Sequence, residues 1–436
     1  MWLKSSRIVS RHWHGCCNYS ISRTCCSDYA RHIFRIFLTN NRIYLNKETL
    51  MSIAVVLPRI MEIGAGAINK LPSIVRSLGG SRTLIITDRM MVQLGYVQKI
   101  QDLLSVDGFE VDVFDGTEPE PTAASIEAGV QCVIDNSYDV IVALGGGSPI
   151  DSAKAIAILG KNGGNIRDYK FPRQVNETGI PIIAIPTTAG TGSEVTRFTI
   201  ITDEKNDEKM LCVGIGFMPF AAIVDVNLTL SLPPRITADT GIDALTHAIE
   251  AYVSQKASPF SDCQALSAMR LIGPNLKEAY INGNNIEARE AMMLGSTLAG
   301  IAFSSASVAL VHGMSRPIGA FFHVPHGLSN AMLLPSVTAF SIPSAPERYA
   351  DCARAIGVAT STDTTEQANQ KLLNALETFN RELQVPTLAE FGADKARFDS
   401  LVGTMAEQAL ASGSPSNNPR IPSTEEMITI YQQLWA

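Results

Sequence analysis

Short apolar runs alternate with longer segments of helical spacing between residues 51 and 230. In segments such as 91–104 and 122–136, which lie between the runs, apolar residues recur every three to four positions. Strands that alternate with helices are typical of βαβ units, and such units predict a mostly parallel sheet. We expect strands at 83–87, 110–114, 139–144, 182–185 and 221–225.

After residue 230 the pattern changes. Strand signals fade, and apolar residues recur at helical spacing up to the C-terminus. One late segment opens with Ser423 and Glu426, which have the spacing of a helix capping box. We therefore predict an α/β Rossmann-like domain with a parallel sheet at 51–230 and an all-helical domain at 231–436.

The stretch 291–315 contains no Lys, Arg, Asp or Glu and is long enough to span a membrane. Several serines dilute it, however, and His312 interrupts its end. We expect buried helices of the helical domain here and no membrane partner.

Length and charge agree with a two-domain globular protein. A chain of 436 residues is too long for one compact core, and 46% hydrophobic with 18% charged residues is an ordinary globular composition. The net charge of −7 argues against a nucleic-acid partner. The charge is uneven, because residues 1–50 carry +6 and residues 51–436 carry −13.

Residues 1–50 read as a leader outside the fold. They are rich in Arg and Ser and nearly free of acids, as transit peptides are. Upstream sequence before a start at Met51 is the favoured interpretation, with a targeting peptide second. A metal or redox tail is the third, although the adjacent cysteine pairs lack C-x2-C spacing. The other four cysteines are scattered, so we expect a reducing compartment: the cytoplasm, or the mitochondrial matrix if the leader is a transit peptide.

A glycine-rich turn, Gly145-Gly146-Gly147-Ser148, follows one predicted strand and opens a helix. Glycine allows a backbone to approach an anion closely. We expect Ser148 to cap the helix and Asp151 to complete a capping box. Free N–H groups at a helix N-terminus form a pyrophosphate site; the alternative is an ordinary strand-to-helix turn.

Two further segments bear on a dinucleotide. The loop 186–194 contains Thr187, Thr188 and Thr191 among glycines and could hold a ribose or nicotinamide, or else simply cap a helix. Asp88 ends the predicted strand 83–87. A carboxylate there binds a ribose 2′-hydroxyl and repels the 2′-phosphate of NADP, unless Asp88 is a plain turn residue.

The segment 64–69, GAGAIN, imitates a G-x-G-x-x-G motif. Asn69 replaces the last glycine, and no convincing strand precedes the segment. We therefore do not assign it to the cofactor.

Four histidines lie in residues 51–436, and three of them share a pattern with one carboxylate. Asp243 and His247 are four residues apart in a helical pattern, so they share a helix face. His312 and His326 are fourteen apart. One carboxylate and three imidazoles make a ligand set for a first-row divalent metal. Glu250 projects from the same face as Asp243 and is expected to support the ligands.

Five motifs in this order resemble those of the iron-containing alcohol dehydrogenase family: GGGSPIDSAKA, PTTAGTGSEVT, GIDALTHAIEAY, HGMSRPIGAFFHVPHG and NPR. The resemblance covers about residues 55–436. It implies a Rossmann-like domain followed by an all-helical domain, a fold shared with dehydroquinate synthase. It also implies a cleft that holds NAD and a divalent metal, with Fe2+ favoured and Zn2+ as the alternative. The implied reaction is hydride transfer between NAD(H) and a small alcohol, diol or hydroxyaldehyde.

Carried over by position, the resemblance implies metal ligands at Asp243, His247, His312 and His326. The implied cofactor contacts are Asp88, Gly146, Gly147, Ser148, Thr187, Thr188 and Lys209. The loop chemistry adds Gly145, Asp151 and Thr191 to the candidates.

The chain departs from the family pattern at Arg316, where many members carry a histidine proposed as a proton relay. Arginine stays protonated and is a poor shuttle. We expect Arg316 to orient a polar or anionic substrate group or to form a structural ion pair. His323 is the candidate for the relay, or else a packing residue. Glu120 stands where several members carry asparagine.

Three alternatives differ in class. A lyase like dehydroquinate synthase needs a basic cluster for its phosphate substrate, and the motifs lack one. A hydroxyacid–oxoacid transhydrogenase would keep NAD bound, and Arg316 favours an acid substrate. A non-catalytic or filament-forming protein would not need this set of motifs. We expect a small-molecule substrate and a homodimer or larger homo-oligomer.

Overall fold

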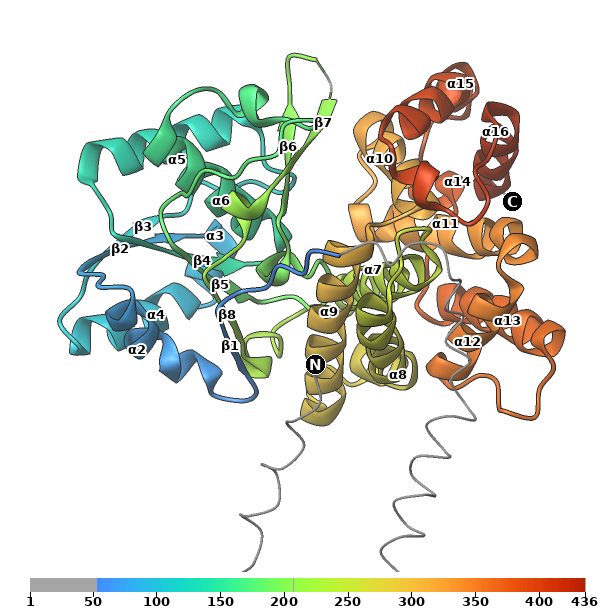
Figure 1. The fold of residues 1–436 in the computed structure, drawn as a ribbon, viewed down its shortest axis with the longest axis horizontal. Helices are drawn as coiled ribbons and strands as arrows, with labels where there is room; N and C mark the ends of the chain where they lie inside the picture. The colour runs from blue at the N-terminus through green and yellow to red at the C-terminus, as the bar shows by residue number, and fades with distance from the viewer. Residues whose placement is uncertain (1–52, 207, 436) are drawn as a thin grey trace, which may run out of the picture. The chain divides into compact units, whose positions relative to one another are not determined.

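A computed structural model describes residues 53–206 and 208–435, so the predicted leader lies outside the described residues. The chain forms a six-stranded sheet in the order β1-β8-β5-β4-β2-β3, in which every neighbouring pair is parallel (Figure 1). The predicted parallel sheet and its five strands are confirmed. The strands are β1 (Ile60–Ile63), β2 (Arg82–Ile86), β3 (Glu110–Phe114), β4 (Val140–Gly145), β5 (Ile182–Pro186) and β8 (Ala221–Val224).

Three strands were not expected. β1 is a half-buried edge strand of four residues, and it precedes the segment 64–69, so the expectation that no strand lies there is wrong. The other two form an antiparallel hairpin, β6 (Phe198–Asp203) and β7 (Glu208–Val213). Its first strand alternates buried and half-buried residues, which is the period of two that a one-sided strand shows.

Alternate residues of the central strands face two hydrophobic layers. Leu84 and Ile86 pack with α5 and α6, whereas Ile85 between them packs with α2, α3 and α4. Figure 1 shows α5 and α6 on one side of the sheet and α2 and α4 on the other. These helices are α2 (Leu71–Ser77), α3 (Arg89–Gln93), α4 (Tyr96–Val106), α5 (Ala123–Asn136) and α6 (Gly147–Asn162).

The second half is helical and shares one large hydrophobic core. The capping box predicted at Ser423 and Glu426 is confirmed, since each backbone N–H donates to the other side chain. Its helices are α7 (Pro234–Val253), α8 (Pro259–Ile281), α9 (Ile286–Ala306), α10 (Leu310–Phe322), α11 (His326–Ser341), α12 (Pro346–Ile356), α13 (Thr365–Glu382), α14 (Leu388–Phe391), α15 (Lys395–Ala411) and α16 (Thr424–Gln432).

Eight short 3-10 turns complete the described elements: Ala67–Lys70, Ile166–Tyr169, Ser193–Val195, Ile215–Phe217, Val226–Leu228, Ile342–Ser344, Ser414–Asn417 and Gln433–Trp435.

The charge-free stretch 291–315 spans most of α9 and the start of α10. Among the described helices, none is by itself long and apolar enough to cross a bilayer. α9 and α10 pass that test only as a pair, and a bend of 103° separates them. Both contribute residues to the helical core, as the sequence predicted.

The two halves meet where backbones touch. A Cβ added at Gly192 would lie 2.6 Å from the Cα of Gly300 on α9, and a Cβ at Gly300 would lie 2.9 Å from the Cα of Gly192. No side chain other than hydrogen fits between them. This contact seats the loop after β5 directly on α9.

Candidate active site

The glycine-rich turn joins β4 to α6 without a side-chain cap. The helix begins at Gly147 after Gly146 as N-cap, so the expected capping role of Ser148 is wrong. Ser148 Oγ instead accepts from the backbone N–H of Glu120 at 3.2 Å. Gly145 has a φ of +145°, which turns the chain into the helix two residues earlier than predicted. The first N–H groups of α6 therefore remain available to an anion.

Asp151 does not complete a capping box either. Its carboxylate accepts from Ser193 Oγ and, at 3.0 Å, from the backbone N–H of Ile200. Burial raises the pKa of Asp151, although the nearby Lys154 opposes that rise. The carboxylate thus ties α6 to the loop after β5 and to β6, which is why it is not free for the helix N-terminus.

Lys154 belongs to the motif GGGSPIDSAKA, but its full burial was not predicted. Its Nζ donates to Ser193 Oγ at 2.8 Å, Thr196 Oγ1 at 3.1 Å and the carbonyl of Phe198 at 2.7 Å. Burial lowers its pKa to about 8. The ammonium joins α6 to the continuous stretch 193–198, which runs from the loop after β5 into β6.

The threonines of the second loop lie against the glycine-rich turn. A Cβ at Gly146 would lie 3.3 Å from Thr188 Cγ2, and one at Gly147 would lie 2.8 Å from Thr191 Cγ2. Thr187 Oγ1 is buried and has no hydrogen-bond partner among the described residues. Because buried hydroxyls are normally satisfied, this orphan fits a polar group of a bound cofactor.

Asp88 caps α3: the backbone N–H of Met91 donates to its Oδ1 at 3.0 Å. The structure therefore shows the turn role, and the contact with a ribose stays a prediction.

The backbone N–H groups of the segment 64–69 are bound by a side chain of the protein, so they are not free for a phosphate. Gly66 and Ile68 donate their N–H groups, each at 3.1 Å, to the two carboxylate oxygens of buried Asp225.

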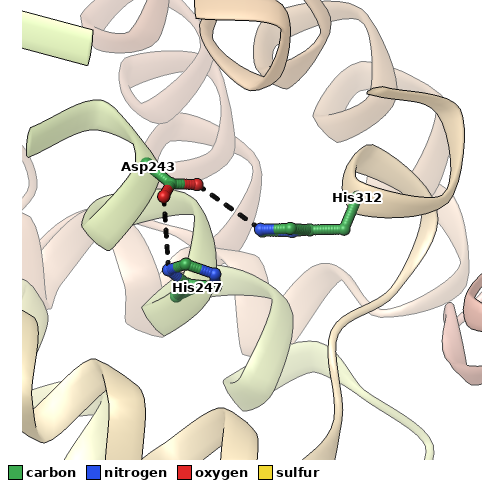
Figure 2. A group of neighbouring side chains, drawn as sticks. All are labelled: Asp243, His247 and His312. Carbon is green, nitrogen blue, oxygen red and sulfur yellow. Dashed lines mark ion pairs between the residues drawn. The ribbon is translucent and has the colours of Figure 1, made fainter. Parts of the chain in front are cut away.

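Three predicted metal ligands form a buried cluster. Asp243 and His247 come from α7, and His312 comes from α10 (Figure 2). Each offers one ligand atom, and these atoms lie within 4.8 Å of one another. His312 Nε2 is 3.5 Å and His247 Nδ1 is 4.0 Å from the carboxylate of Asp243. His247 also stacks on Phe303 with ring centroids 4.2 Å apart.

His326 lies at the edge of this cluster as the first residue of α11. Its Nε2 is 3.8 Å from Asp243 Oδ1, and 34% of its side chain is exposed. The fourth predicted ligand is therefore next to the other three and faces the open side.

Glu250 supports the cluster from behind, as its helical position suggested. Its Oε2 is 2.7 Å from His312 Nδ1 and accepts at 2.8 Å from the N–H of Ala309. This contact leaves His312 Nε2 directed toward Asp243. Such outer hydrogen bonds fix the tautomer and orientation of a histidine ligand.

Asn330 is a cluster residue that the sequence did not reveal. Its Nδ2 donates to Asp243 Oδ1 at 2.7 Å and lies 3.2 Å from Nε2 of both His312 and His326. It stands one helical turn after His326, and this spacing was the only available signal.

The electrostatics of the cluster suit a cation. Burial alone would raise the pKa of Asp243, but the neighbouring histidines outweigh it and hold that pKa well below its usual range. Burial lowers the pKa of His247 to about 4. The pKa of His326, whose side chain is one-third exposed, is lowered in the same direction by partial burial and by the charge of His312. For His312 burial acts the same way, but Glu250 and Asp243 dominate and raise its pKa to about 9.

The donor set also fits a metal. His247 Nδ1 is buried and has no hydrogen-bond partner among the described residues. A buried carboxylate with nitrogen donors around it is the ligand chemistry of first-row divalent ions. Asp243, His247, His312 and His326 are thus placed to hold one.

One cavity of about 230 Å³ reaches both the glycine-rich turn and the metal cluster. Gly147, Ser148 and Thr191 line it from the α/β half, and Asp243, His247 and His312 line it from the helical half. Lys209 on β7 also lines it and forms an ion pair of 2.9 Å with Glu120. The cofactor-side and metal-side candidates therefore share one space.

The two proposed catalytic residues have different positions. Half-buried Arg316 on α10 lines the cavity. His323 is exposed, ends α10 with a left-handed φ of 55°, and is not among the residues that line the cavity. The structure does not bring His323 into the site.

Two family models match consecutive parts of the chain. Residues 58–226 match "Iron-containing alcohol dehydrogenase", and residues 237–435 match "Fe-containing alcohol dehydrogenase family, C-terminal". The chain belongs to the iron-containing alcohol dehydrogenase family. The resemblance that the motifs carried is therefore confirmed.

Relatives and solved structures of this family differ in what they act on. "Long-chain-alcohol dehydrogenase 1" of Geobacillus thermodenitrificans is 40% identical over 82% of this chain and 91% of its own length. The structure of a 1,3-propanediol oxidoreductase superposes with a TM-score of 0.85 at 35% identity, over 88% of this chain and 100% of that chain. A sulfoacetaldehyde reductase of Bifidobacterium kashiwanohense in complex with NAD+ superposes with a TM-score of 0.80 at 29% identity, over 88% and 99%. The predicted fold class is confirmed, and the enzyme is an oxidoreductase.

Proposed function

We propose that this iron-containing alcohol dehydrogenase interconverts a small alcohol and its aldehyde with NAD(H) and a divalent metal. The observation that carries the proposal is the shared cavity. Gly147 and Ser148 of the glycine-rich turn and the Asp243 cluster line the same space. A hydride can pass between cofactor and substrate only where the two meet.

The cofactor side of the cavity is built for a dinucleotide. The uncapped N–H groups at the start of α6 suit a pyrophosphate, and the orphan hydroxyl of Thr187 suits a ribose or carboxamide. Bound NAD supplies the hydride acceptor. The NAD+ complex of the sulfoacetaldehyde reductase supports this choice of cofactor.

The helical side orients the reacting oxygen. Asp243, His247, His312 and His326 would hold the metal, with Glu250 fixing His312. A bound divalent metal polarises a carbonyl and favours the alkoxide of an alcohol. The family name favours Fe2+, and the same donors accept Zn2+.

Two phenylalanines keep water away from the reacting carbon. Phe198 and Phe303 line the cavity, and their rings stack 6.2 Å apart. Phe303 also covers the ring of His247. This apolar wall strengthens the electrostatic interactions of the cluster.

The proposal is tested with protein loaded anaerobically with Fe2+ or Zn2+. Oxidation of NADH is followed with a panel of alkanals, hydroxyaldehydes and aldehyde acids, and metal content is measured in parallel. We expect metal-dependent turnover of at least one class. Protein that binds both metal and NADH yet reduces no aldehyde would overturn the proposal.

A further inference from the structure

Arg316 has no ionic partner in the described part of the chain. Within residues 53–206 and 208–435, no carboxylate oxygen lies within 4.0 Å of its guanidinium, and no hydrogen bond joins it to another residue. The side chain is half-buried and lines the active-site cavity. Burial lowers the pKa of Arg316, yet an arginine remains charged at neutral pH. A partly desolvated charge without a partner carries a free-energy cost.

The other charges that line the cavity are balanced. Lys209 is paired with Glu120 at 2.9 Å. Asp151 lies 3.8 Å from the ammonium of buried Lys154. Asp243 is surrounded by histidines that are candidate metal ligands. Among the described residues that line the cavity, Arg316 is the charged side chain without an ion-pair partner within 4.0 Å; the nearest negative influence on its guanidinium is the buried carboxylate of Glu250, which His312 and two backbone N–H groups already engage.

The position of Arg316 is on the metal side of the cavity. It follows His312 by four residues on α10, so the two side chains leave the same helix face one turn apart. Arg316, Lys209 and Leu211 also line a second cavity of about 590 Å³ that adjoins the first. Arg316 thus borders both the cavity that holds the metal cluster and this neighbouring cavity.

We propose that Arg316 determines specificity by binding an anionic group at the far end of the substrate. The substrate is then a short aldehyde, or the corresponding alcohol, that carries a carboxylate or sulfonate. A planar guanidinium binds such groups through two parallel hydrogen bonds. This inference rests on the proposed alcohol–aldehyde oxidoreduction and names its substrate class.

The test compares charged and neutral aldehydes of similar size. Succinate semialdehyde is paired with pentanal, and sulfoacetaldehyde with propanal, using metal-loaded enzyme and NADH. The variants are Arg316→Met, which removes the charge, and Arg316→Lys, which keeps it. Arg270→Met is the matched control, because it removes the same charge from an exposed position on α8.

We expect the wild type to prefer at least one anionic aldehyde over its neutral partner. The preferred aldehyde shows whether the bound group is a carboxylate or a sulfonate. Arg316→Met should raise KM for that substrate roughly tenfold or more while leaving its neutral partner nearly unchanged. Arg316→Lys should recover part of the preference. Arg270→Met should behave as the wild type.

If Arg316→Met loses the same fraction of kcat/KM with charged and neutral aldehydes, Arg316 supports the fold and the inference is overturned. If the variant raises the Kd for NADH, Arg316 contacts the cofactor, and the inference is overturned as well. A readout without turnover separates this from failure of the proposed function. Butyrate should raise the Tm of wild-type protein but not that of Arg316→Met, whereas butyramide should shift neither. A missing butyrate shift in the wild type would also overturn the inference.

Discussion

The two walls of the active-site cavity are built by opposite means. On the α/β side, loops after β4 and β5 present backbone N–H groups and hydroxyls, with glycines where other atoms come close. On the helical side, α7, α10 and α11 present buried side chains that hydrogen bonds hold in place. A backbone site is sensitive mainly to added volume, whereas a side-chain site is sensitive to the loss of any one group.

Loss of a metal-side imidazole should therefore have the largest effect. His312→Ala removes one ligand and the imidazole partner of buried Glu250, which then keeps only its two backbone donors. We expect activity to fall more than about 100-fold, because loss of even an outer partner of a metal ligand costs about 10- to 100-fold. Activity and bound metal, measured by elemental analysis, should fall together. Near-normal activity in a metal-free variant would refute the assignment.

Added volume on the cofactor side should have an intermediate effect. The Cβ of Gly147→Ala would lie 2.8 Å from Thr191 Cγ2, so overpacking should raise KM for NAD about tenfold. Metal content should not change. The double variant Gly147→Ala with Thr191→Ser removes the clashing methyl group and should recover part of the affinity. If the double variant does not recover affinity for NAD and also contains less metal than the wild type, the two walls of the cavity are not independent.

A smaller effect is expected at Asp88, where two roles can be separated. Asp88→Ser keeps a good N-cap for α3 but removes the charge, whereas Asp88→Ala removes both. If the carboxylate repels the 2′-phosphate of NADP, both variants should relax the preference for NAD about tenfold, equivalent to about 1.4 kcal/mol. Only Asp88→Ala should lower Tm. Equal kcat/KM for NAD and NADP in the wild type would remove the charge argument.

The smallest effect is expected at His323. Because this histidine is exposed and outside the cavity lining, His323→Ala should leave kcat and its pH profile unchanged. It also serves as the matched control for His312→Ala, since it removes an imidazole from the C-cap of the same helix. A flattened acidic limb in the pH profile would instead restore the proton-relay role.

The same contrast explains what could be predicted from the sequence. β4 is buried along its whole length, so its continuous apolar run could be recognised as a strand from the sequence. β1 was missed because it is a short half-buried edge strand. The hairpin was missed because the buried positions of β6 include polar Thr199 and Asp203, so its sequence lacks the apolar alternation of a one-sided strand. The pair of cluster ligands at helical spacing, Asp243 and His247, could also be recognised from the sequence.

Partners distant in the sequence were not predictable. Lys154 bonds to residues about 40 positions away, and Asn330 reaches Asp243 across 87 positions. Lys154 lies in the motif GGGSPIDSAKA and Asn330 lies one turn after His326, but neither position indicates which distant residue the side chain contacts. The cap predicted at Ser148 was wrong for a local reason. The backbone turns at Gly145, so Gly146 and not Ser148 is the N-cap of the helix.

The contact between Gly192 and Gly300 has a mechanical consequence. Two backbones that touch have no side chains between them to slide or repack, so a relative motion of the two halves would turn about this contact as a hinge. Phe303, which covers His247, lies one turn along α9 from Gly300. A hinge at this contact would change distances near His247 least and those farther along the cavity most, so cofactor exchange would not require the metal cluster to loosen.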